Sequence, residues 1–131
     1  MRHNRAMAQK VCGTAHQSGV HYVWCREIGE RGRPHYHLAI MLNKDAYSSL
    51  GMFELGRNNN YNRVQEAWAS ALVLPVASAS GRAHISENPV YEIHRDDPAA
   101  RADFLYRTSY ICKVATKVFG DGLHCFGASR A

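Results

Sequence analysis

The sequence contains no apolar stretch of the length that a membrane-spanning helix needs, which is about 20 residues. Its first residues, Met1–Arg5, are polar and basic and are followed by no apolar signal core. Internal repeats and low-complexity tracts are absent as well. With 131 residues, 46% of them apolar and 21% charged, the chain fits one globular domain, and we expect it in the cytoplasm, with no membrane partner.

The sequence also lacks the paired spacings of a structural zinc site, Cys-x-x-Cys and His-x₃-His. Its four cysteines, Cys12, Cys25, Cys112 and Cys125, are scattered along the chain. We therefore rank a structural zinc domain low and expect free thiols in a reducing compartment. A Cys112–Cys125 disulfide stays open as an alternative if the tail folds back.

Acidic residues are outnumbered by basic ones, 11 against 16, which gives a formal net charge of +5. Eight histidines can add positive charge in mild acid. This balance favours polyanionic partners, of which nucleic acid is the usual one. Many proteins that bind no nucleic acid are equally basic, so charge alone does not decide the function.

Two histidines one residue apart lie in the β-type run 34–42. Because side chains alternate faces along a strand, His35 and His37 point the same way, roughly 7 Å apart. A partner strand is predicted at 22–28, which is β-branched and aromatic, with 29–33 as the hairpin loop. The two strands are expected to form a hairpin that presents both imidazoles on one face.

The register of this hairpin decides whether a third ligand joins the imidazoles. With the turn centred on Arg31, Glu27 lies opposite His35 and Cys25 lies opposite His37, and opposed residues share a face. Glu27, His35 and His37 would then form a group suited to a divalent metal. A slip of one residue would turn Glu27 away, and a His-x-His pair on a half-exposed strand is often ordinary surface.

The rest of the chain predicts mainly helices and loops. A capped turn is expected at 43–51, a small-residue linker at 76–81, and His84 and His94 are interpreted as ordinary histidines. One helix is expected at 2–18. A second helix, capped by Asn60, is expected to run to Pro75 with four apolar residues on one face, Val64, Trp68, Ala71 and Leu72. Two short strands are expected at 82–86 and 90–94.

A last helix is predicted from about 98 to 118, because Asp97 can cap it and Pro98 suits its first turn. On such a helix Tyr106, Tyr110, Lys113 and Lys117 fall within one stripe roughly 60° wide. Phenols and ammonium groups in a row suit attack on a phosphodiester, with a metal to activate the phosphate. An amphipathic helix with a solvated rim gives the same pattern.

His35-Tyr36-His37, followed by Tyr110-Ile111-Cys112-Lys113, resembles the motif pair of the HUH endonucleases. Within that superfamily, residues 20 to 130 are most similar to the YagK/YfjJ C-terminal domain family, which is related to inovirus replication-initiation proteins. The matching stretches are 22–27, 34–37, 42–47, 62–63, 66–69, 88–91, 104–107, 109–113, 116–117 and 120–122.

The resemblance implies an α+β fold with an antiparallel sheet and flanking helices. It also implies nicking and joining of single-stranded DNA at an origin, to start rolling-circle replication of a phage, prophage or plasmid-like element in a bacterial host, alongside host replication proteins. Tyr110 matches the nucleophile that forms a 5′-phosphotyrosine link, Tyr106 resembles a second tyrosine, and Lys113 completes the motif. His35 and His37 match the metal pair for Mg²⁺ or Mn²⁺, with Glu27 added from the predicted register.

In proteins of this kind a central strand precedes the first helix, whereas this chain begins at or near that helix. We therefore expect an N-terminally truncated domain whose sheet lacks its first central strand. Two imidazoles favour Mn²⁺ or another transition metal over Mg²⁺. The basic residues expected at the DNA are Arg31, Arg33, Lys113, Lys117 and Arg130. A non-catalytic DNA-binding module derived from this family is the alternative function, and the oligomeric state stays open.

Overall fold

The computed structural model describes residues 18–130, which form a small α+β fold of three antiparallel strands and three α-helices. The expected helix at 2–18 lies outside the described residues. The described residues divide into two compact units, which we describe separately: the sheet unit, 19–42 with 92–130, and the α2 unit, Ser18 with 43–91. Within residues 18–130, no helix combines the length and the apolar character that crossing a bilayer requires.

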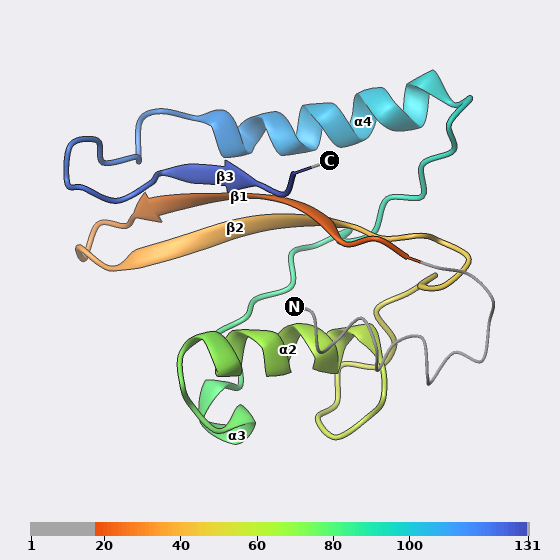
Figure 1. Cartoon of the computed structure of the whole chain (residues 1–131), viewed down its shortest axis with the longest axis horizontal. Helices are drawn as coiled ribbons and strands as arrows, with labels where there is room; N and C mark the ends of the chain where they lie inside the picture. The colour runs from red at the N-terminus through yellow and green to blue at the C-terminus, as the bar shows by residue number, and fades with distance from the viewer. Residues whose placement is uncertain (1–17, 131) are drawn as a thin grey trace. The chain divides into compact units, whose positions relative to one another are not determined.

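The sheet unit is built on the hairpin of β1 (His21–Ile28) and β2 (Pro34–Met41). The short β3 (Phe126–Ala128) pairs with the other side of β1, so that the strand order is β2-β1-β3 (Figure 1). Alternating aromatic and β-branched residues favour strands in both hairpin arms. The predicted hairpin is confirmed, whereas β3 was not predicted.

The register places Glu27 opposite His35 and Cys25 opposite His37, as the sequence predicted. The loop between the strands is closed by two backbone hydrogen bonds, from Gly32 N to Gly29 O at 2.9 Å and from Gly29 N to Arg33 O at 3.1 Å. The turn is therefore centred on Arg31, and the three side chains of the predicted metal group share one face of the sheet.

Helix α4 (Pro98–Ser109) begins where the sequence predicted, with Asp97 accepting a hydrogen bond from Ala100 N at 2.9 Å. Its predicted end at 118 is wrong: a short 3-10 turn, η1 (Tyr110–Cys112), follows directly, and the chain then leaves helical geometry. Thr108 donates its hydroxyl to the carbonyls of Phe104 and Leu105. Such bonds compete with the backbone ladder and weaken a helix at this point.

The α2 unit contains α2 (Asn60–Ala71) and the one-turn α3 (Val76–Ala79), which replaces the expected linker. The residue that caps α2 is Asn59 rather than Asn60, and its side chain accepts a hydrogen bond from Asn62 N at 3.0 Å. The strands expected at 82–86 and 90–94 do not form, because neither segment has a partner strand in the described chain. His84 and His94 are exposed.

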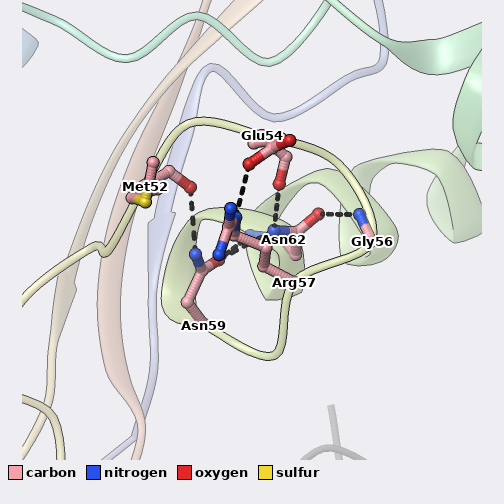
Figure 2. Close-up of polar contacts among 6 residues, drawn as sticks. All are labelled: Met52, Glu54, Gly56, Arg57, Asn59 and Asn62. Atoms are coloured by element: carbon pink, nitrogen blue, oxygen red, sulfur yellow. Dashed lines mark hydrogen bonds and ion pairs between the residues drawn. The ribbon is translucent and has the colours of Figure 1, made fainter.

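Asparagine side chains form most of the hydrogen bonds that hold the segment before α2 (Figure 2). Asn62, which is 3% exposed, accepts from Gly56 N at 3.0 Å and donates to Glu54 O at 2.8 Å. Asn59 donates to Met52 O at 2.9 Å. These bonds satisfy loop backbone groups that no strand or helix would satisfy, and the expected turn at 43–51 is confirmed by the bond from Tyr47 N to Asn43 O.

Candidate metal centre

The candidate site is made by Glu27 on β1 and by His35 and His37 on β2. The Oε2 atom of Glu27 lies 3.0 Å from His37 Nε2 and 3.9 Å from His35 Nε2. The two imidazole rings meet edge to face, with their centroids 5.7 Å apart. One ligand atom from each residue lies within 4.8 Å of the others, which is a separation that a single bound ion can bridge.

The three side chains differ sharply in exposure. The carboxylate of Glu27 is 7% exposed, whereas the side chains of His35 and His37 are 50% and 43% exposed. The acid therefore forms the base of the site, and the imidazoles form a rim that is open to solvent. A site with protein ligands on one side and an open opposite side is typical of catalytic metal centres, whereas structural sites are closed.

His35 is positioned by the space that Gly29 leaves. A Cβ atom on Gly29 would lie 2.9 Å from Cε1 of the His35 ring, which is closer than such atoms approach in folded proteins. The backbone of Gly29 does not adopt a positive φ, so its conformation alone does not require glycine. Glycine therefore serves close packing here, and any side chain at this position would push the imidazole aside.

Behind the carboxylate lies Lys117, whose side chain is only 1% exposed. Its Nζ atom lies 3.3 Å from Oε1 of Glu27 and also donates a short hydrogen bond to the carbonyl of Lys113. The backbone N–H of Ile28 donates to Thr116 O at 3.0 Å and so joins this segment to the end of β1. Lys117 was expected at the DNA surface on a helix; the early end of α4 instead lets it turn inward.

The carboxyl group of Glu27 is held in its charged form. Burial raises its pKa, but nearby groups, namely the Thr116 hydroxyl, the Lys117 ammonium and His37, lower it by more, so that its pKa lies below the usual 4.5. Within the described residues the Thr116 hydroxyl is buried and has no hydrogen-bond partner of good geometry. We therefore ascribe the lowered pKa mainly to Lys117 and His37, which lie 3.3 Å and 3.0 Å from the carboxylate oxygens.

The tyrosines precede this segment. Tyr106 lies on α4 and Tyr110 begins the 3-10 turn, with exposed fractions of 85% and 60%. The ammonium of Lys113 lies 5.3 Å from the centroid of the Tyr110 ring, and Lys113 N donates to Tyr110 O at 3.1 Å. A continuous set of contacts thus links Tyr110, Lys113, Lys117 and Glu27.

A second ion pair fixes the chain after Lys117. Arg26, which is 5% exposed, donates from a terminal guanidinium nitrogen to Oδ2 of Asp121 at 2.7 Å and from Nε to His124 O at 3.3 Å. Hydrogen bonding from Arg26 lowers the pKa of Asp121 below its usual value. Because Arg26 neighbours Glu27 in β1, the pair anchors the segment that delivers Lys117.

The cysteines of the sheet unit are free thiols. Cys25 and Cys125 are buried and Cys112 is exposed, so the alternative Cys112–Cys125 disulfide is not formed. Burial raises the pKa of Cys25, although Lys117 lowers it in part. Cys25 thus packs beside the site as a thiol and lies outside the group of three candidate ligands.

The basic residues predicted to contact DNA are placed at the surface of the sheet unit, with the exception of Lys117. Arg31 and Arg33 are exposed in the β1–β2 loop, next to His35 in sequence. Arg130 is exposed after β3. Lys113 is exposed beside Tyr110.

Comparison with known proteins assigns this chain to a protein family. The family model described as the YagK/YfjJ C-terminal domain matches residues 2–129. The chain belongs to the YagK/YfjJ C-terminal domain family. It is 36% identical over 116 residues to the "Uncharacterized protein YfjJ" of Escherichia coli (strain K12), covering 86% of this chain and 56% of that protein.

A second relative gives the same assignment. The chain is 35% identical over 111 residues to the "Uncharacterized protein YagK" of Escherichia coli (strain K12), covering 82% of this chain and 53% of that protein. This YagK/YfjJ domain therefore spans about half the length of the curated relatives it matches. No solved structure shows a significant match.

Several residues of the site in this YagK/YfjJ domain were not predicted from the sequence in their actual roles. Lys117 and Thr116 were placed on a helix, and Arg26 and Asp121 were given no role. The alternation of side chains along β1 places Arg26 and Glu27 on opposite faces of the sheet. No local pattern indicates which distant residues form ion pairs with them. The signal for Asp121 was its position between Gly120 and Gly122, both of which adopt a positive φ and so permit a tight loop.

Proposed function

We propose that this domain nicks and joins single-stranded DNA with a tyrosine nucleophile, assisted by a divalent metal ion. The observation that carries the proposal is the convergence of Glu27, His35 and His37 on one face of the hairpin. One carboxylate and two imidazoles suit Mn²⁺ or another first-row transition metal and also accept Mg²⁺. The donor set and its open rim therefore fit the metal that such chemistry uses.

The roles of the residues follow from their chemistry. A divalent ion, when bound by Glu27, His35 and His37, withdraws charge from a phosphate and makes its phosphorus more electrophilic. The phenol oxygen of Tyr110 attacks this phosphorus, and the phenol proton goes to solvent. The bond from phosphorus to the 3′ oxygen breaks, that oxygen takes up a proton to become a free 3′ hydroxyl, and the 5′ phosphate stays on the tyrosine.

Lys113 supports this step as a cation beside the phenol ring. Its ammonium stabilises negative charge that develops on the phenol oxygen and on the phosphate in the transition state. Tyr106, four residues before Tyr110, supplies a second hydroxyl, so that a second strand transfer can take place while the first DNA product is still covalently held on Tyr110. Arg31 and Arg33 beside the imidazoles, together with Arg130, contact the phosphates of the flanking DNA.

This proposal assigns the domain to the start of rolling-circle replication, because a nick with a free 3′ hydroxyl primes synthesis on the intact strand. The origin, the replicating element and any host replication proteins are parts of the same proposal. Support comes from the basic net charge of +5 and from the family resemblance of the His-x-His and Tyr-x-x-Lys motifs.

The test is formation of a covalent adduct. The full chain is incubated with Mn²⁺ and a varied set of labelled single-stranded oligonucleotides, and SDS-resistant protein–DNA adducts are resolved by electrophoresis and assigned by peptide mass spectrometry. We expect an adduct at Tyr110 in the wild type, its loss in Tyr110→Phe, and its retention in the control Tyr91→Phe, a tyrosine of the α2 unit. Absence of an adduct with every oligonucleotide would contradict the proposal.

A non-catalytic DNA-binding module would give a different result. It would bind the oligonucleotides with a strong salt dependence, form no adduct, and bind equally well after substitution of His35 and His37.

A further inference from the structure

The two oxygen atoms of Glu27 have different partners. Oε2 faces the imidazoles, at 3.0 Å from His37 Nε2, whereas Oε1 faces the ammonium of Lys117 at 3.3 Å. An ammonium group has only donors, so its hydrogen bond takes up a lone pair of Oε1 and places a positive charge beside that oxygen, which makes Oε1 a poorer ligand for a metal ion than Oε2. In this arrangement Glu27 can offer one oxygen to a metal and not two.

Lys117 is fixed in this position by its surroundings. Its side chain is 1% exposed, and its Nζ atom also donates a hydrogen bond to the carbonyl of Lys113. The neighbouring residue Thr116 is tied to β1 through the hydrogen bond from Ile28 N. Burial and two hydrogen bonds therefore hold the positive charge of the ammonium beside the site.

From this geometry we propose that Lys117 is a positioning residue that limits Glu27 to a single metal-ligating oxygen and lowers the affinity of the site for divalent cations. The inference rests on the proposed function, because it assumes that Glu27, His35 and His37 bind the metal. Two imidazoles and one carboxylate oxygen make three ligands, which leaves several coordination positions for phosphate oxygens and water. The positive charge of Lys117 also attracts an anionic substrate, such as a phosphate group, to these remaining coordination positions.

The effect on affinity follows from the charges. With Lys117 the three ligands and their nearest cation have no net charge, whereas without it they carry one negative charge. The ammonium of Lys117 and the carboxylate of Glu27 are both buried, so these charges interact more strongly than they would in bulk water. Removal of the ammonium charge is therefore expected to tighten Mn²⁺ binding by about tenfold or more.

The experiment compares Mn²⁺ dissociation constants in the wild type and three variants, measured on the metal-free full chain from the EPR signal of free Mn²⁺. Lys117→Gln keeps a hydrogen-bond donor for Oε1 but removes the charge, and Lys117→Arg keeps both. Lys44→Met, an exposed lysine of the α2 unit, is the matched control. We expect tighter binding only in Lys117→Gln, with Lys117→Arg within about threefold of the wild type; far-UV circular dichroism checks each fold.

Each outcome decides the inference. Unchanged or weaker Mn²⁺ binding in folded Lys117→Gln would overturn it, and so would loss of folding in Lys117→Gln with a folded Lys117→Arg, because Lys117 would then serve stability alone. Failure of the proposed function looks different: the wild type would bind no Mn²⁺, or would bind it equally well after His37→Ala.

Discussion

The Nε2 atom of His37 lies 3.0 Å from Oε2 of Glu27, although the two residues come from different strands of the hairpin. They are not directly opposed: Glu27 pairs with His35, and His37 pairs with Cys25, two positions along. The carboxylate therefore reaches diagonally across the sheet, within the range that cross-strand neighbours on one face allow. This diagonal contact makes one acid accessible to both imidazoles.

Metal binding should depend on both imidazoles. In the wild type, Mn²⁺ at about 100 times its dissociation constant should raise the free energy of unfolding by about 2.7 kcal/mol, and EDTA should reverse the effect. His37→Ala should abolish most of this gain, because it removes one of three ligands. Thermal unfolding with and without Mn²⁺ measures it.

The control for this prediction is His84→Ala, which removes an exposed histidine of the α2 unit. An equal Mn²⁺ response in His37→Ala and in the wild type would mean that the ion binds elsewhere.

Stability should fall in acid through Glu27. Its pKa is lower in the folded chain than the usual 4.5, so its charged form stabilises the fold. This contribution is complete above about 4.5, the unfolded value, and is lost as the pH falls through the lower folded value. Urea unfolding from pH 7 to pH 2 measures it.

The matched variant is Glu27→Gln, in which the buried ammonium of Lys117 loses its counter-charge. Breaking a buried pair in this way costs about 3–5 kcal/mol at pH 7. The variant should therefore be less stable at neutral pH and show a weaker decline in acid. A parallel decline in both proteins would show that other carboxylates control acid unfolding.

The sequence predicted the hairpin and its register well because both depend on local chemistry. Alternation in β1 and β2 and a five-residue loop centred on Arg31 favour the arrangement with Glu27 and His35 on a common face, which the structure has. The start of α4 was equally local, since Asp97 caps it and Pro98 opens it. In each case residues adjacent in sequence supply the hydrogen bonds.

The missing parts depend on distant partners. The chain after α4 is attached to β1 by the hydrogen bond from Ile28 N to Thr116 O, and helical periodicity does not signal this long-range contact. Lys117 is therefore buried beside the site, whereas the sequence predicted that it is exposed. Similarly, 82–86 is β-prone but has no neighbouring strand in the described chain, whereas the three residues of β3 pair with β1 despite a weak pattern.

Gly29→Ala should weaken metal binding more than it weakens the fold. The added methyl group would lie 2.9 Å from Cε1 of the His35 ring, so the ring must shift from its present position in the metal group to make room. We expect Mn²⁺ affinity to fall about tenfold, as for loss of other groups that orient metal ligands. The Mn²⁺ dissociation constant and the midpoint of urea unfolding are measured together.

The matched control is Gly127→Ala on β3, where the new Cβ would lie 2.8 Å from Nε1 of Trp24. Trp24 neighbours Cys25 and so faces away from the metal group. This variant should lose stability and keep its Mn²⁺ affinity. Equal affinity losses in the two variants would indicate a general loosening of the sheet.

Asp121→Ala should loosen the segment that follows Lys117. The guanidinium of Arg26 would keep His124 O as a hydrogen-bond partner but lose its carboxylate at 2.7 Å. Because Arg26 N also donates to Cys125 O, the same residue anchors both ends of this loop. Amide hydrogen exchange at pH 7 should become faster at 120–128, and Asp45→Ala in the α2 unit serves as the control. Unchanged protection of 120–128 would mean that the pairing of β3 with β1 holds the loop without the ion pair.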